Sequence, residues 1–222
     1  MKGYNAEFLK DPLGFFRRHV ILMNSAVGTN PPDVMDMDLV PASLWKRLKD
    51  ERAGFDKKNW SKEENVTVVG AEQAFYLTPF ERSSPSKYAH PIRAYWLHYQ
   101  QGQVKQLQLG GSATLMFTPT LNGCTFAVGP GANPIVVHAN YQTSGSDGRR
   151  IDQTKMDTEI GKIITPVKTF RKADYESPDL PSVNVTVLGI NTDRWRFYWQ
   201  SRAPENTQGE KAFTRLGAPQ EI

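Results

Sequence analysis

From Asn65 onward the sequence is a succession of short segments rich in β-branched and aromatic residues, and this pattern is the strongest constraint on the fold. Clusters of Gly, Pro, Asn or Ser separate most of these segments, as expected of strands joined by turns. The predicted strands lie in NVTVVGAEQAFYLT, IRAYWLHYQ, QVKQLQL, SATLMFT, CTFAV, PIVVHANY, VNVTVLGI and DRWRFYWQS. The sequence therefore predicts a chain that is built mainly from β-structure.

Helical patterns are few. Pro12 fits the first turn of a helix that begins near Asp11. The segment 41–55, PASLWKRLKDERAGF, carries apolar residues at helical spacing, and so does DQTKMDTEIGKII at 152–164. The stretch VGTNPPDVMDMDLVP at 27–41 is predicted to be a loop because of its Asn, Pro and Asp content.

These patterns predict one α+β domain over residues 1–222, an antiparallel β-sandwich or a bent mixed sheet flanked by helices. Within it we expect a helical N-terminal part (1–60), a β-rich core (65–202) and a loosely held tail (203–222). A chain of 222 residues can bury a stable core without crosslinks. Cys124 is the only cysteine, so no disulfide can form within the chain.

The charge pattern argues against several classes of partner. A net charge of +4 is scattered along the chain, whereas nucleic-acid binding requires a basic stripe. No apolar run reaches the roughly 18 residues that a membrane span needs. The VILM patch lies too late for a cleavable signal peptide, so we expect any secretion to be independent of Sec. No His, Cys or Asp cluster has the spacing of a metal site, so no metal is expected.

One predicted hairpin brings together two residues with reactive side chains. The strands CTFAV and PIVVHANY are joined by GPGAN, whose residues favour a turn. If Val128 closes this loop opposite Pro134, Cys124 lies directly opposite His138. Side chains opposite each other in an antiparallel pair have Cβ atoms about 4.5–5.5 Å apart, which allows a thiol–imidazole contact.

A thiol beside an imidazole is the arrangement of a cysteine nucleophile and its base. The histidine can take the thiol proton and leave a thiolate–imidazolium pair, and a third group must then orient the imidazole ring. The preceding turn adds two candidates for substrate binding, Asn122 and Gly123. Gly123 permits a close backbone approach, and amides near Cys124 can face a developing oxyanion.

The segment LMFTPTLNGCTFAVGPG followed by VVHANY resembles the catalytic core of the glutamine deamidase toxins, which include Burkholderia lethal factor and the catalytic domain of cytotoxic necrotizing factor. That family has a Leu-Ser-Gly-Cys turn, and here Asn122 replaces the serine. The resemblance assigns Cys124 as nucleophile, His138 as base and Thr118 as the group that orients the histidine. The match is confined to this part of the chain, and the chemoreceptor deamidases share a similar Cys–His arrangement.

The resemblance implies a protein-glutamine deamidase that needs no cofactor and acts as a monomer. It further implies a secreted bacterial toxin or effector acting in the host cytosol, and otherwise a protein of the bacterial cytoplasm. Its partner would be a host protein with an exposed glutamine, such as a GTPase or a translation factor. Arg149 and Arg150, in the predicted mobile loop 143–150, are candidates for contacting this partner.

Two other interpretations remain open from the sequence. The same thioester could be captured by an amine, which would make the protein a transglutaminase. Alternatively, the chain is a β-rich binding module without catalytic activity. A lone free cysteine is usually a small buried hydrophobic residue, and Cys124 would then serve only for packing.

Overall fold

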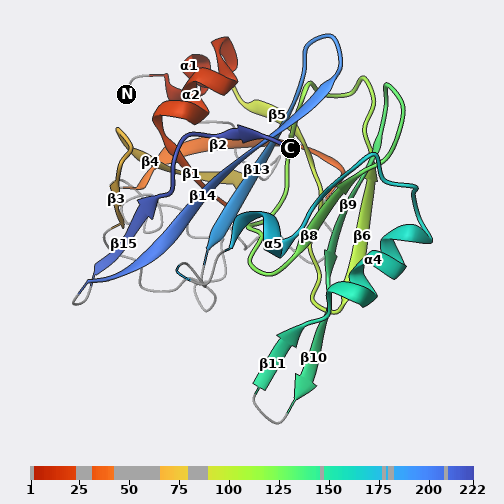
Figure 1. Cartoon of the computed structure of the whole chain (residues 1–222). Helices are drawn as coiled ribbons and strands as arrows, with labels where there is room; N and C mark the ends of the chain where they lie inside the picture. The colour runs from red at the N-terminus through yellow and green to blue at the C-terminus, as the bar shows by residue number, and fades with distance from the viewer. Residues whose placement is uncertain are drawn as a thin grey trace.

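The computed structural model describes residues 3–23, 32–42, 66–79, 90–145, 148–176, 179, 183–207 and 210–222. It is an α+β structure with many strands and few helices, as the sequence predicts. Two sheets face each other (Figure 1). The larger sheet matches the predicted bent mixed sheet.

The larger sheet has ten strands and runs in the order β1-β4-β2-β5-β7-β13-β14-β15-β3, with β16 also paired to β14. Most pairs are antiparallel, but β1/β4, β5/β7 and β15/β3 are parallel. The strands are β1 (Val20–Met23), β2 (Val34–Pro41), β3 (Val66–Val69), β4 (Ala74–Pro79), β5 (Ile92–Trp96), β7 (Leu115–Phe117), β13 (Asn184–Asn191), β14 (Trp195–Thr207), β15 (Glu210–Arg215) and β16 (Gln220–Glu221).

This sheet curls until it is nearly closed. Its two ends approach each other where β3 contacts β4. The edge strand β1 also contacts the middle of the sheet: Thr186 Oγ1 of β13 donates to the backbone oxygen of Ile21 at 2.8 Å. Helices α1 (Tyr4–Lys10) and α2 (Pro12–Arg18) cover the apolar interior, into which Phe8, Phe15 and Phe16 are fully buried. Asp11 caps α2 by accepting from Gly14 N at 2.9 Å, so this helix begins where the sequence predicts.

The smaller sheet has four antiparallel strands in the order β12-β8-β9-β6. These are β6 (Gln103–Gln108), β8 (Thr125–Val128), β9 (Ile135–Asn140) and β12 (Lys168–Phe170). Helix α4 (Gln153–Gly161) packs on the outer face, and the hairpin of β10 (Gln142–Gly145) and β11 (Gly148–Ile151) projects from the end of β9 (Figure 1). A short helix, α5 (Lys172–Tyr175), follows β12.

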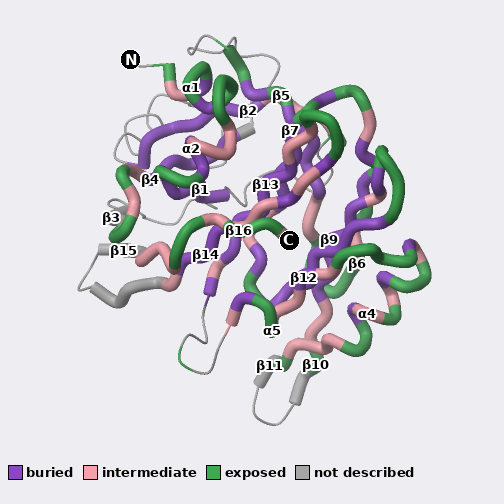
Figure 2. The backbone as a smooth tube through the Cα atoms, turned by 45° about the horizontal axis from the view of Figure 1, so that its top comes forward, coloured by how far each residue is buried: buried purple, intermediate pink, exposed green. Residues whose placement is uncertain are grey.

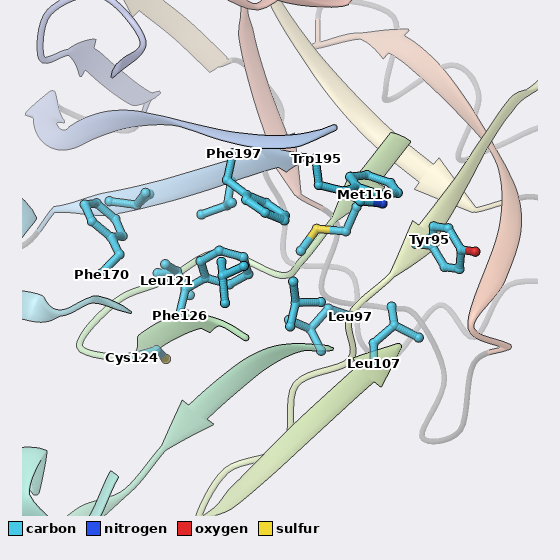
Figure 3. Packing of buried hydrophobic residues seen from close by; sticks show 14 of the residues in the cluster. Tyr95, Leu97, Leu107, Met116, Leu121, Cys124, Phe126, Phe170, Trp195 and Phe197 are labelled. Atoms are coloured by element: carbon cyan, nitrogen blue, oxygen red, sulfur yellow. The ribbon is translucent and has the colours of Figure 1, made fainter. Parts of the chain in front are cut away.

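The inner face of the smaller sheet packs on the larger one through a shared apolar cluster. Phe126 of β8 meets Phe197 of β14 with ring centroids 5.4 Å apart, and Phe170 meets Trp199 at 4.9 Å. Cys124 belongs to the same cluster (Figure 3). Figure 2 shows β9 as mostly buried, and all four residues of β8 are buried as well. The candidate residues therefore lie between two sheets.

The N-terminal part differs from the prediction of a helical segment over 1–60. It contributes two strands to the larger sheet, and β2 occupies most of the predicted loop 27–41. The polar residues of this strand are accommodated by specific partners: buried Asp38 accepts from Asn5 Nδ2 at 2.6 Å, and Asn5 Oδ1 accepts from Leu39 N at 2.9 Å. The helix predicted over 41–55 lies outside the described residues, apart from Pro41, which ends β2, and Ala42.

Two segments predicted to be loose are strands. The tail 203–222 extends β14 and adds β15 and β16, and Ile222 N donates to Phe197 O at 2.9 Å. The segment 143–150 forms most of the β10–β11 hairpin, in which Thr143 pairs with Arg150. Both are rich in polar residues, which hide strand character from a pattern search, because backbone pairing does not require apolar side chains.

Candidate active site

Cys124 lies directly before β8, and His138 lies within the neighbouring strand β9. The observed register pairs Phe126 with His138 and Thr125 with Ala139. Continuing it by one residue places Cys124 opposite Asn140. The predicted pairing of Cys124 with His138 is therefore wrong by two residues. A shift of two keeps both side chains on the same face of the sheet, and they become diagonal neighbours.

The shift has a local cause in the loop that joins the two strands. Val128 pairs with Val136, and Gly129 N donates to Ile135 O at 2.8 Å. Pro134 is not available to β8, because its carbonyl accepts from Leu109 N of the next segment at 3.0 Å. The loop is consequently longer than the five residues expected from the sequence.

Thr118 and His138 form a hydrogen-bonded pair that fixes the state of the imidazole. Thr118 follows β7, and its Oγ1 lies 2.7 Å from His138 Nδ1. The same hydroxyl donates its only hydrogen to the carbonyl of Leu97 at 3.0 Å. It must therefore accept from Nδ1–H, which leaves Nε2 as the unprotonated nitrogen. This Nε2 is buried and has no hydrogen-bond partner among the described residues.

Cys124 is surrounded by polar groups as well as by the apolar cluster. Asn140 Nδ2 donates to its sulfur at 3.1 Å and to the hydroxyl of Tyr99 at 3.2 Å. Tyr175 of α5 donates to the Cys124 carbonyl at 3.0 Å and so holds the backbone at this point. The ring of Tyr99 lies 5.3 Å from that of His138. The thiol thus lies at the border of the cluster, with amide, phenol and imidazole groups nearby.

The site is closed in this structure. Cys124 is 2% exposed and His138 1% exposed, because β8 and β9 are the central strands of the smaller sheet. Burial raises the pKa of the Cys124 thiol, an effect that hydrogen bonding to the Asn122 backbone and to the Asn140 amide partly offsets. Burial, with a smaller contribution from His98, lowers the pKa of His138 to about 3. The resting pair is a neutral thiol and a neutral imidazole rather than the expected thiolate–imidazolium pair.

The turn before Cys124 is in contact with the projecting hairpin. Gly123 has a φ of +79°, which favours glycine, and a Cβ at this position would lie 2.5 Å from Ile151 Cδ1. Ile151 ends β11, so the base of the hairpin contacts the turn. Arg149 and Arg150 precede it on this strand, and Arg150 is exposed. The side chain of Asn122 is exposed and turns toward Asn184 Oδ1, 3.2 Å away.

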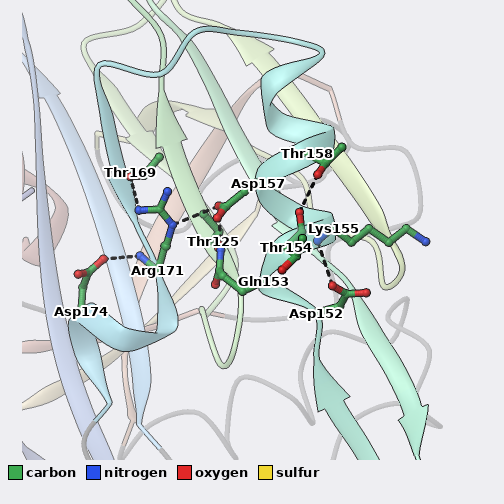
Figure 4. Close-up of polar contacts among 10 residues, drawn as sticks. All are labelled: Thr125, Asp152, Gln153, Thr154, Lys155, Asp157, Thr158, Thr169, Arg171 and Asp174. Atoms are coloured by element: carbon green, nitrogen blue, oxygen red, sulfur yellow. Dashed lines mark hydrogen bonds and ion pairs between the residues drawn. The ribbon is translucent and has the colours of Figure 1, made fainter.

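A polar network on the outer face of the smaller sheet holds α4 against β8 (Figure 4). Gln153 Nε2 donates to Thr125 Oγ1 at 2.9 Å and to Asp157 Oδ1 at 3.0 Å. Arg171 Nε donates to the same Asp157 oxygen at 3.1 Å, and its Nη1 donates to Thr169 of β12 at 2.9 Å. Thr125 directly follows Cys124, so this network supports the nucleophile strand from behind.

Three residues of the site were not identified from the sequence. Asn140 had a detectable signal, because it lies two positions after His138 on a strand and so shares its face. Tyr99 and Tyr175 had none, because each reaches the site from a segment distant in sequence. The structure brings Thr118 into hydrogen-bond contact with His138 and places Cys124, next to Gly123, on the same face of the smaller sheet. His138 Nε2 has no hydrogen-bond partner among the described residues, so the expected thiol–imidazole contact is not formed there. The arginines lie beyond this site, on the hairpin.

Neither a metal centre nor a membrane span is found among the residues that the structure describes. No group of three or more His, Cys, Asp or Glu side chains there could hold a metal ion. Within the same ranges, no helix is long and apolar enough to cross a bilayer. No protein-family model matches the sequence, and no curated protein sequence matches it.

Proposed function

We propose that this protein is a cysteine hydrolase that deamidates glutamine side chains of a protein substrate, with Cys124 as nucleophile and His138 as base. One observation carries the proposal: the chain of contacts from Leu97 O through Thr118 Oγ1 to His138 Nδ1 leaves Nε2 as a free base on the face that carries Cys124. A histidine whose Nδ1–H is held by an orienting group, with Nε2 left free, has the arrangement of a general base.

The short resemblance to the deamidase toxins supports the same assignment. It gives the orienting role to Thr118, and this hydroxyl lies in contact with the histidine ring. We therefore also propose that the fold is related to that of the cytotoxic necrotizing factor catalytic domain, and that the protein is a secreted effector acting on a host GTPase or translation factor.

The chemistry proceeds from a neutral pair. His138 Nε2 takes the Cys124 proton as sulfur attacks the carboxamide carbon, and an oxyanion forms. The imidazolium then gives this proton to the amide nitrogen, the C–N bond breaks, and ammonia leaves a thioester. His138 next deprotonates a water, which attacks the thioester. The C–S bond breaks, the thiolate regains its proton, and glutamate is released.

Substrate entry requires a movement, because the thiol is buried at rest. Tyr99 is half-buried, and it contacts His138 through its ring and Asn140 through its hydroxyl. We place the entrance beside this ring. A narrow entrance suits a single glutamine side chain presented by a folded protein.

The decisive experiment compares target-cell lysate treated with the wild-type protein or with Cys124→Ser. We expect glutamine-to-glutamate conversion on a small set of peptides, detected by mass spectrometry, only with the wild type. An added primary amine tests the alternative acyl transfer, because a transglutaminase would attach the amine at the same positions. Identical peptide maps for the two proteins would refute both reactions and leave Cys124 as a packing residue.

A further inference from the structure

Asn140 contacts the nucleophile but has no role in the chemical steps proposed above. It is 3% exposed, so its side-chain amide is shielded from bulk water. Both hydrogens of its Nδ2 have partners, namely Cys124 Sγ and Tyr99 OH. Its Oδ1 is also buried, and it has no hydrogen-bond partner among the described residues. A buried acceptor without a donor is unfavourable unless a ligand supplies the donor.

A second acceptor without a partner lies on the same face of β9. Since Thr118 takes Nδ1–H, His138 Nε2 presents a lone pair and no hydrogen. His138 and Asn140 are separated by one residue along the strand, so their side chains point the same way. The thiol lies beside them, opposite Asn140. The nucleophile is therefore flanked by two buried acceptors that both lack an N–H donor.

A primary carboxamide has the complementary chemistry, because its NH2 group supplies two donors from one nitrogen. A carboxylate of the same size supplies none and would place negative charge against two lone pairs. An ester likewise has no hydrogen to give. We propose that Asn140 Oδ1 accepts a hydrogen bond from the NH2 group of a substrate carboxamide and so selects a primary amide over the corresponding acid, while the lone pair of His138 Nε2 stays available for the Cys124 proton.

This inference rests on the proposed function, and it assigns to Asn140 the recognition of the leaving group. This hydrogen bond would hold the amide nitrogen near His138, whose imidazolium delivers the proton after Nε2 has taken it from Cys124. Once ammonia has left, the acid product loses the hydrogen bond to Asn140. The site would consequently bind the product more weakly than the substrate, which favours release.

Matched alkylating reagents test the recognition without a protein target. Chloroacetamide carries a primary carboxamide, and chloroacetate carries a carboxylate of almost the same size. The rates of Cys124 alkylation by the two reagents are measured by mass spectrometry on the folded protein. Their ratio is divided by the ratio for the same protein in urea, which removes the intrinsic difference in reactivity.

We expect the normalised ratio to favour chloroacetamide by on the order of 10-fold in the wild type. Asn140→Leu removes the acceptor with little change in size and should bring the ratio close to one. Asn140→Asp retains an acceptor and should preserve the preference. Asn133→Leu makes the same change in the exposed loop of this hairpin and should behave as the wild type. Thermal melting checks that each variant is folded.

Three results would overturn the inference: equal normalised ratios in the wild type and Asn140→Leu, a preference for chloroacetate, or no alkylation of folded Cys124 by either reagent. These outcomes are independent of the lysate experiment. Glutamine conversion together with a flat reagent ratio would leave the deamidase standing and remove Asn140 from recognition. A clear amide preference without any glutamine conversion would support recognition by Asn140 and refute the deamidase.

Discussion

At the scale of single residues, Thr118 joins the backbone to the base. Replacing it by Val keeps the shape but leaves Nδ1–H of His138 without its acceptor. We expect Thr118→Val to lower the deamidation rate by about 10- to 100-fold, equivalent to about 1.4–2.7 kcal/mol. Thr118→Ser should stay within a few-fold of wild type, because it retains the hydroxyl.

Nitrogen NMR of the His138 ring provides a readout that does not depend on the target. The wild type and Thr118→Ser should show the Nδ1–H tautomer, and Thr118→Val a mixture of tautomers. If Thr118→Val retained full activity and a single tautomer, the orienting group would have to be another residue.

The low pKa of His138 predicts a dependence of stability on pH. The folded value is about 3 and the ordinary value is 6.5, so below pH 6.5 the unfolded chain binds a proton that the folded chain does not. The stability contributed by the neutral ring is therefore complete above pH 6.5 and is lost as the pH falls toward 3. The slope is at most about 1.4 kcal/mol per pH unit.

Urea unfolding at several pH values between 7 and 4 measures this effect. His138→Gln should show a flatter profile than the wild type. Buried His19, whose pKa is lowered mainly by desolvation, contributes in the same direction and serves as the comparison through His19→Gln. Parallel profiles for the wild type and His138→Gln would show that His138 titrates normally in the folded protein.

At the scale of elements, the β10–β11 hairpin and the nucleophile turn are sterically coupled. Gly123→Ala forces a positive φ on alanine and brings Cβ against Ile151 Cδ1, so we expect a loss of about 1–3 kcal/mol in the free energy of unfolding. Ile151→Ala removes the atoms that would clash.

In the Ile151→Ala background the added cost of Gly123→Ala should therefore be smaller, leaving only the backbone strain. Urea denaturation of the four proteins of this double-mutant cycle measures the coupling. Additive effects would show that the hairpin base and the turn do not contact each other.

The outer-face network makes a smaller contribution to stability. Asp157→Ala removes the acceptor shared by Gln153 and Arg171, whose side chain is 39% exposed. Because water screens this pair, we expect about 1 kcal/mol and a fall in Tm of about 2–4 °C. Glu159→Ala on the same helix breaks only an exposed pair with Lys162 and should shift Tm less. Equal shifts would contradict a special role for the network.

The sequence predicts strand identity better than strand pairing. CTFAV and PIVVHANY are strands because β-branched and apolar residues suit a pleated surface, and their polarity pattern also places Cys124 and His138 on one face. Their register depends on Pro134, which pairs with Leu109 through a contact that no local pattern encodes. The burial of the thiol likewise follows from β14, which supplies Phe197 from a distant part of the chain.

At the scale of the whole molecule, the N-terminal strands are part of the sheet that supports the site. β2 lies between β4 and β5, and β5 pairs with β7, which leads to Thr118. A chain that begins at residue 60 loses the link between β4 and β5. We expect it to be unfolded, with poor dispersion in its proton NMR spectrum and with Cys124 alkylated at the rate of a free thiol. A well-dispersed spectrum with a protected Cys124 would show that residues 60–222 fold alone.

The path of the chain between the two sheets also has a consequence for how the protein is made. Leu121 bridges to Val185, and β7 pairs with β13, so the turn before Cys124 is closed by residues that the ribosome adds some sixty positions later. Pairings of such long sequence separation form slowly. During synthesis the thiol therefore emerges well before its enclosure exists. The nascent chain passes through a stage in which its one cysteine is open to oxidation, because β13 has not yet been synthesised and cannot enclose it.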